Sequence, residues 1–167
     1  IEDCDDFNRF DDPTIIDNWT KQAGDWHIQN AKLAPERVAE WQIITFDNSE
    51  LTNGTARGRF LFGSGTDLRF AGLIARYTTT NSGLQVKLQN QSTSNQWSNL
   101  FVSENGSNIW GVSEDFGTDV FMEATYSGTD LQINLDTNRD GIWDHNYTVT
   151  TNTTSSGLNG CSGYGLA

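Results

Sequence analysis

Several residue types are scarce in this sequence. Among 167 residues there are one methionine, two prolines, two cysteines and two histidines. No stretch approaches the roughly 20 apolar residues that a membrane-spanning helix needs, so membrane insertion is not expected. The few cysteines and histidines are also too scattered to supply the clustered ligands of a zinc site.

Positive charge is in short supply as well. The chain has ten lysines and arginines but 22 aspartates and glutamates, so its formal net charge is −12. Such a chain cannot neutralise an array of phosphates, which argues against nucleic acid and anionic membrane surfaces as partners. The acidity fits cation binding, high salt or solubility outside a cell, and solubility alone is enough to explain it.

Patterns that carry catalysis are missing. Glycosidases built on β-sandwiches need two carboxylates that flank a cleft, commonly spaced Glu-x-Asp-x-x-Glu on one strand, and no such spacing occurs here. Glu114 and Asp115 are adjacent, so they would point to opposite faces of a strand. His27 lies between Trp26 and Ile28 and is expected to face solvent. No phosphate loop or cofactor fingerprint is present, so we expect no enzyme.

The two cysteines, Cys4 and Cys161, lie near opposite ends of the chain. A disulfide between them would close nearly the whole chain into one loop, which stabilises on the order of 4–5 kcal/mol in the loop-closure model. It would also imply an oxidising, extracellular compartment. The alternative is two unrelated free thiols. The chain shows no signal-peptide pattern, so we expect that a leader has been removed or left out.

Six asparagines occupy N-x-[ST] acceptor positions for glycosylation. Several such matches arise by chance in a chain rich in Asn and Thr, but six are consistent with a secreted surface. The candidates are Asn18, Asn53, Asn90, Asn105, Asn146 and Asn152.

What the chain does contain is typical of β-structure. Six Trp, nine Phe and four Tyr lie in short runs separated by Gly, Asn, Asp and Ser turns. Leu131, Ile133 and Leu135 alternate with polar residues, and Tyr147 and Val149 continue the alternation on the returning strand. Helix is almost absent, with at most one turn near residues 34–40. About ten short strands predict a two-sheet antiparallel sandwich.

Three segments resemble bacterial laminin-G-like, or concanavalin-A-like, jelly-roll domains. They are residues 5–33, 70–89 ("FAGLIARYTTTNSGLQVKLQ") and 135–148 ("LDTNRDGIWDHNYT"). The resemblance implies a single jelly-roll domain over residues 1–167. It says little about function, because such domains serve as lectins, adhesion modules, enzyme appendages and structural units. The matched positions of the first segment are Asp5, Asp6, Phe7, Arg9, Trp19, Thr20, Trp26, Ile28 and Leu33.

The end of the chain departs from that pattern. Such domains follow a glycine-rich segment with a last strand of the form i-D-n-f-x-v, whereas this chain ends in "GLNGCSGYGLA" over residues 157–167. The final strand is therefore expected to be missing. A sandwich that lacks it exposes an open edge, which favours strand exchange with another chain.

A possible calcium loop runs from Asp136 to Tyr147. Asp136, Asn138 and Asp140 fall at ligand positions 1, 3 and 5, with Gly141 at the sharp turn. The carbonyl of Ile142 and the carboxylate of Asp144 would occupy positions 7 and 9, but Tyr147 stands where a bidentate Glu is expected. The alternative is a charged hairpin turn without metal. The predicted ligands are Asp136, Asn138, Asp140, Ile142 and Asp144.

Exposed tryptophans are candidates for stacking on sugar rings. Trp19 and Trp26 belong to the core pattern of the resemblance, whereas Trp41, Trp97 and Trp110 lie in polar, turn-rich surroundings. The competing interpretation for each of these three is partial burial in the core.

We therefore predict a secreted, non-catalytic, calcium-stabilised module that binds extracellular glycan or a surface protein in adhesion. The alternative is a structural subunit that assembles into a filament or extracellular matrix through an open sheet edge. A glycoside-active enzyme is a distant third.

Overall fold

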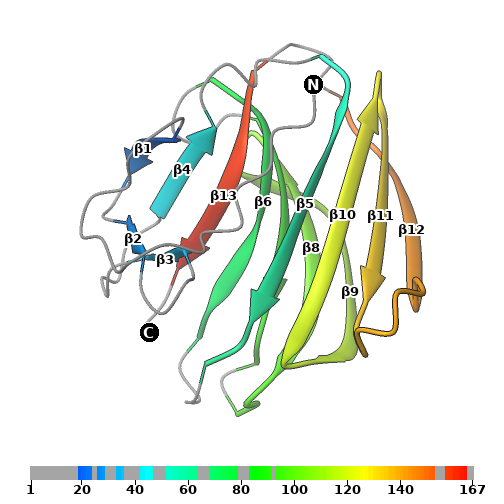
Figure 1. The fold of residues 1–167 in the computed structure, drawn as a ribbon. Helices are drawn as coiled ribbons and strands as arrows, with labels where there is room; N and C mark the ends of the chain where they lie inside the picture. The colour runs from blue at the N-terminus through cyan, green and yellow to red at the C-terminus, as the bar shows by residue number, and fades with distance from the viewer. Residues whose placement is uncertain are drawn as a thin grey trace.

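Two antiparallel β-sheets stack face to face and enclose the core (Figure 1). The computed structural model describes residues 19–23, 26–28, 33–35, 42–46, 52–63, 68–78, 83–91, 93–152 and 157–164. No helix among them is long and apolar enough to cross a membrane. The strands are β1 (Trp19–Ala23), β2 (Trp26–Ile28), β3 (Leu33–Pro35), β4 (Gln42–Phe46), β5 (Gly54–Leu61), β6 (Phe70–Tyr77), β7 (Leu84–Gln89), β8 (Trp97–Glu104), β9 (Ser107–Gly117), β10 (Asp119–Ser127), β11 (Asp130–Asp136), β12 (His145–Thr150) and β13 (Leu158–Tyr164).

The two sheets differ in size. The large sheet has seven strands in the order β1-β4-β13-β6-β7-β8-β9, and the small sheet has four in the order β12-β11-β10-β5. Strands β2 and β3 form a separate hairpin. The all-β sandwich is thus confirmed, with more strands than the ten that were expected. Most of the predicted helical turn, residues 36–40, lies outside the described residues.

Alternation along the strands builds the core. In β10, Val120, Met122 and Ala124 point between the sheets, while Phe121 and Glu123 face outward. The predicted hairpin of β11 and β12 follows the same rule for its apolar residues, which all face the core. On the outer face of β11, Asp130 and Gln132 are exposed, whereas Asn134 and Asp136 are buried. The buried cluster comprises Phe60, Leu73, Ala75, Leu84, Val86, Leu88, Trp97, Leu100, Val102, Phe116, Val120, Met122, Ala124, Tyr126, Leu131, Ile133, Leu135 and Val149.

Arg76 fastens one end of the sandwich. Its side chain is only 1% exposed and donates hydrogen bonds to the carbonyls of Thr52, at 3.0 and 2.7 Å, and Gly128, at 2.8 Å. The guanidinium also lies 5.1 Å from the ring centre of Tyr126. Gly157 leaves room for this corner, since a Cβ there would come within 2.3 Å of the Arg76 backbone. One side chain thereby ties β6 to the segment before β5 and to the β10–β11 turn.

The strands at the sheet margins are β5 and β12 in the small sheet and β1 and β9 in the large one. Within the described residues, β5 pairs only with β10. The predicted missing strand would follow residue 167, and residues 165–167 are outside the described part of the chain.

Candidate functional site

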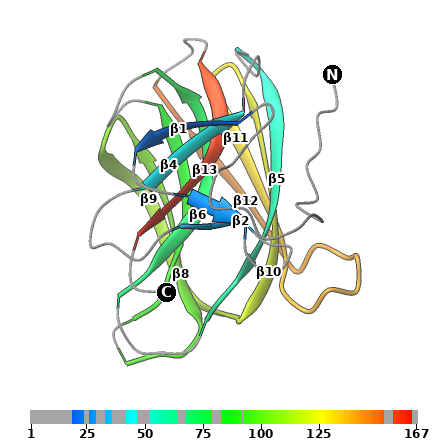
Figure 2. The same cartoon turned by 60° about the vertical axis from the view of Figure 1, so that its left-hand side comes forward.

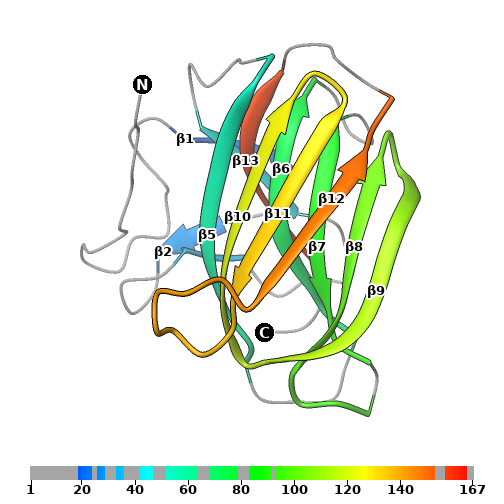
Figure 3. The ribbon, with the colours of Figure 1, turned by 90° about the vertical axis from the view of Figure 1, so that its right-hand side faces the viewer.

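The strands of the small sheet lie side by side, and one face of the sheet is turned away from the large sheet (Figure 3). Every second residue of β5, β10, β11 and β12 points away from the core, so the strand register places these side chains in rows across the sheet. Successive rows contain Phe121, Glu123, Thr125 and Ser127 of β10.

One row is a continuous chain of hydrogen bonds, here called the polar ladder. Arg57 Nε donates to Glu123 Oε2 at 2.6 Å, and Asn134 Nδ2 donates to Glu123 Oε1 at 3.0 Å. Asn146 Nδ2 then donates to Asn134 Oδ1 at 2.6 Å. The ladder crosses all four strands and links these side chains to one another, so it favours a fixed arrangement of this row.

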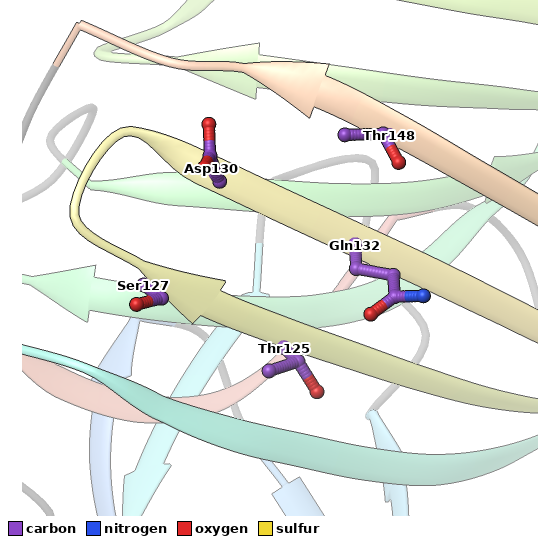
Figure 4. A pocket seen from close by; sticks show the side chains of 5 residues that line it. All are labelled: Thr125, Ser127, Asp130, Gln132 and Thr148. Carbon is purple, nitrogen blue, oxygen red and sulfur yellow. The ribbon is translucent and has the colours of Figure 1, made fainter.

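The next row borders a shallow depression, here called the outer groove (Figure 4). Its volume is about 360 Å³. The Oγ1 atom of Thr125 shares a hydrogen bond of 2.9 Å with Thr55 on β5. The lining side chains are Thr125, Ser127, Asp130, Gln132 and Thr148. Hydroxyl, amide and carboxylate groups are the kinds that position a polar ligand.

An aromatic platform lies at the opposite end of the same face. The rings of Phe121 and Trp143 are stacked at 9° with centroids 5.9 Å apart, and Arg139 lies 5.6 Å above the Phe121 ring. Trp143 remains 40% exposed. Beside this platform, Arg59 forms two hydrogen bonds to Asp119, at 2.8 and 2.5 Å. A neighbouring ring fixes the orientation of the indole and leaves much of its surface open.

The Trp143 ring is held by the acidic hairpin loop, residues 136–144, which stands out from the sandwich (Figure 2). The two carboxylate oxygens of Asp136 accept the amides of Arg139, at 2.6 Å, and Gly141, at 3.0 Å. Arg139 and Gly141 both have positive φ, of 65° and 83°. Asn138 Oδ1 accepts the Asp140 amide at 3.0 Å. Short polar side chains thus close this loop by local turns.

Asp144 fastens the other end of the loop. Its Oδ2 accepts the backbone amide of Thr137 at 2.7 Å and the Thr137 hydroxyl at 2.8 Å, while Oδ1 accepts Asn138 Nδ2 at 3.3 Å. These hydrogen bonds, first the Thr137 amide and then its hydroxyl, lower the pKa of the Asp144 carboxyl, and the nearby His145 adds to the effect. The ionised carboxylate is therefore the form that holds the loop.

All five predicted calcium ligands lie in the acidic hairpin loop. Within the described residues, no three side chains of His, Cys, Asp or Glu converge to hold a metal ion. The residue types suit calcium, but Asp136 and Asp144 are occupied by backbone and side-chain donors, and Asp140 Oδ1 accepts the Ile142 amide at 2.8 Å. The geometry is that of a hairpin closed by its own hydrogen bonds, and calcium stays a prediction.

The three stacking candidates have different positions. Trp97 is only 3% exposed, makes an edge contact with Phe62 and donates from Nε1 to the Phe60 carbonyl at 3.4 Å. Burial leaves it no face for a sugar, so the stacking prediction is wrong for Trp97. Trp110 is half-buried and packs on Tyr147 with centroids 5.1 Å apart. Trp41 lies outside the described residues.

Trp110 adjoins a polar cluster where β9 meets β12. The Tyr147 hydroxyl shares a hydrogen bond of 3.2 Å with His145 Nδ1, which also lies 3.1 Å from Glu114 Oε2. Burial, followed by the Glu114 carboxylate, raises the pKa of Tyr147 to about 12. The rings of Phe116 and His145 meet edge to face at 5.2 Å. These contacts join β9, at the margin of the large sheet, to β12, at the margin of the small sheet.

The remaining predictions concern covalent modification. Asn90 is 0% exposed, accepts the Arg69 amide at 2.6 Å and donates to the Ser94 carbonyl at 3.2 Å. Its side-chain nitrogen is inaccessible in the folded protein, so this glycosylation prediction is wrong for the native chain. The described acceptors with exposed side chains are Asn53, Asn105, Asn146 and Asn152. Asn18 and Cys4 lie outside the described residues, and of Cys161 only the backbone in β13 is described.

Sequence reasoning overlooked Trp143 and the outer face of the small sheet. The sequence did contain a signal, because Ile142 and Trp143 form an apolar pair at the tip of an otherwise polar turn. Large apolar side chains at such a tip do not pack in the core, so their exposure indicates a binding surface. Ile142 is 67% exposed. The outer groove could not be recognised, because Thr125 and Gln132 come together only through the strand register.

Comparisons with known proteins identify the fold. No protein-family model and no curated protein sequence matches the chain. Among solved structures, the carbohydrate-binding module CBM66 from Bacillus subtilis matches with a TM-score of 0.69 and 16% identity over 89% of each chain. The VIP36 exoplasmic/lumenal domain, solved with Ca²⁺ and Man3GlcNAc bound, matches with a TM-score of 0.63 and 14% identity over 89% of this chain and 77% of that chain.

A third match is the GH43 protein BlXynB from Bacillus licheniformis, with a TM-score of 0.63 and 14% identity. It covers 96% of this chain but only 37% of the longer protein. The fold is thus the concanavalin-A-like jelly roll that lectins and carbohydrate-binding modules share, which confirms the resemblance found in the sequence. At these identities the likeness concerns the fold alone.

Proposed function

We propose that this chain is a non-catalytic, secreted module that binds glycan through the outer face of its small sheet. The observation that carries the proposal is the exposed indole of Trp143, stacked on Phe121 beside a face of polar side chains. A fixed aromatic ring offers an apolar surface to the carbon face of a sugar, and nearby amides and hydroxyls suit its hydroxyl groups. Two solved proteins of this fold, a carbohydrate-binding module and a domain with Man3GlcNAc bound, support the same proposal.

The test is binding of soluble neutral polysaccharides, followed by tryptophan fluorescence and calorimetry. Trp143→Ala is expected to weaken binding by roughly tenfold or more, because it removes a large contact surface. Trp143→Phe should retain part of the affinity. The matched control is Ile109→Ala on β9, an apolar side chain that is 37% exposed and lies on the other sheet. Equal affinity of wild type and Trp143→Ala would overturn the proposed site.

We propose calcium separately as a ligand of the acidic hairpin loop, on the grounds of its residue types. Support comes from the ligand-like spacing and from a relative of the same fold that was solved with Ca²⁺ bound. Calorimetric titration of CaCl₂ into the chelator-treated protein is expected to show binding that Asp140→Ala removes. Asp115→Ala, in an exposed part of β9, is the control. If the titration shows no heat of binding, the calcium proposal is wrong and the loop is closed by its own hydrogen bonds alone.

Assembly into a filament or matrix is the second candidate function. The position of β5 at a sheet margin, paired only with β10 among the described residues, favours it. Electron microscopy and light scattering at increasing protein concentration test it directly. Polymers would favour the structural role, and a monomer at all concentrations would exclude it.

A further inference from the structure

We infer that the outer groove is a second subsite for the same ligand and that it selects a neutral, hydroxyl-rich chain. This inference rests on the proposed glycan-binding function and goes further, because it assigns a ligand class and requires a ligand longer than a single sugar ring. Three features of the small sheet support it: unsatisfied polar groups, a single negative charge and the distance from the aromatic platform.

The first feature is a contrast between two neighbouring rows. The four side chains of the polar ladder, from Arg57 to Asn146, are joined to one another by hydrogen bonds. In the outer groove, the Thr125 hydroxyl is bonded to Thr55. The other four lining side chains make no hydrogen bond with any described residue, so their donors and acceptors are available to a ligand. They are Ser127, Asp130, Gln132 and Thr148.

The second feature is the charge of the groove. Among the described residues that line it, Asp130 is the only charged one, and Arg57 in the adjoining row is already paired with Glu123 at 2.6 Å. A carboxylate accepts two O–H bonds at once, which matches two adjacent hydroxyls on a sugar ring. It repels sulfate or carboxylate on a ligand, and the net charge of −12 adds to that repulsion. The groove therefore favours neutral sugars over anionic ones.

The third feature is the separation of the two ends of the face. Phe121 and Thr125 lie on the same side of β10, four residues apart, which corresponds to roughly 14 Å. One sugar ring cannot contact Trp143 and the groove together. A linear oligosaccharide that lies along β10 can contact both, passing over the polar ladder.

The experiment measures affinity as a function of chain length. Neutral linear oligosaccharides, from disaccharide to hexasaccharide, are titrated into the intact protein and into Asp130→Asn. The wild type is expected to bind the hexasaccharide roughly tenfold more tightly than the disaccharide, and Asp130→Asn should remove most of that advantage. Thr148→Val should act in the same direction. The control is Ser107→Ala, because Ser107 is an exposed residue of β9 in the large sheet and does not line the groove.

A soluble neutral glucan and its sulfated derivative test the charge argument. The wild type should prefer the neutral form, and Asp130→Asn should narrow the difference. Binding that is lost in Trp143→Ala but keeps its length dependence in Asp130→Asn would overturn this inference and leave the proposed function intact. Failure of every neutral glycan to bind would overturn both. Circular dichroism confirms that each variant is folded.

Discussion

At the scale of single residues, Arg76 joins β6 to two segments that lie outside the strands. It donates three hydrogen bonds to the backbone carbonyls of Thr52 and Gly128. We expect Arg76→Lys to lower the free energy of unfolding by roughly 2 kcal/mol, because an ammonium cannot reproduce the fork of a guanidinium. The positive φ of 56° at this position is unchanged by the substitution, so the difference reports the side chain.

Urea unfolding of both proteins measures that loss. The control is Arg57→Lys, since Arg57 pairs with Glu123 at an exposed site and is expected to cost less than about 1 kcal/mol. If the two variants lose the same free energy of unfolding, the hydrogen bonds of Arg76 contribute no more to stability than an exposed ion pair does.

Tyr147 gives a prediction about alkaline pH. Its pKa is raised to about 12 in the folded state from an ordinary value of 10.0, chiefly by burial and then by Glu114. The folded protein therefore binds more protons than the unfolded chain between pH 10 and about 12, so stability should fall as pH rises through that window. Denaturant unfolding at successive pH values tests this. Tyr147→Phe should flatten the slope, and an unchanged slope would contradict the assignment.

At the scale of elements, the acidic hairpin loop holds the aromatic platform in place. Asp144 closes this loop, because its carboxylate accepts hydrogen bonds from both the backbone amide and the hydroxyl of Thr137. Asp144→Asn should loosen the loop, seen as faster amide exchange at Thr137 and altered Trp143 fluorescence, while the sheet amides stay protected. Because the folded pKa of Asp144 is depressed, the wild-type loop should loosen in the same way only as pH falls below the ordinary value of 3.8. Full protection of Thr137 in the variant would rule this out.

The same elements show what could be predicted from sequence. The hairpin of β11 and β12 was correctly predicted, since Leu131, Ile133 and Leu135 have a strict period of two. Burial of Trp97 was one of two interpretations that the sequence left open, because its polar neighbours gave no sign of a contact with Phe62 across 35 residues of sequence. Rows such as the polar ladder depend on the register of four strands, and no local pattern records that register.

At the scale of the whole molecule, the net charge of −12 opposes the compact state. Raising NaCl from roughly 0.01 to 0.15 M shortens the Debye length from about 30 to about 8 Å, so the melting temperature should rise.

CaCl₂ at matched ionic strength separates general screening from specific binding. If calcium binds the acidic hairpin loop, it should raise the melting temperature beyond NaCl or MgCl₂, and Asp140→Ala should remove only that excess. If all three salts raise the melting temperature equally, cations act on this protein only by screening its charge. If NaCl lowers the melting temperature, repulsion among the acidic residues does not limit stability.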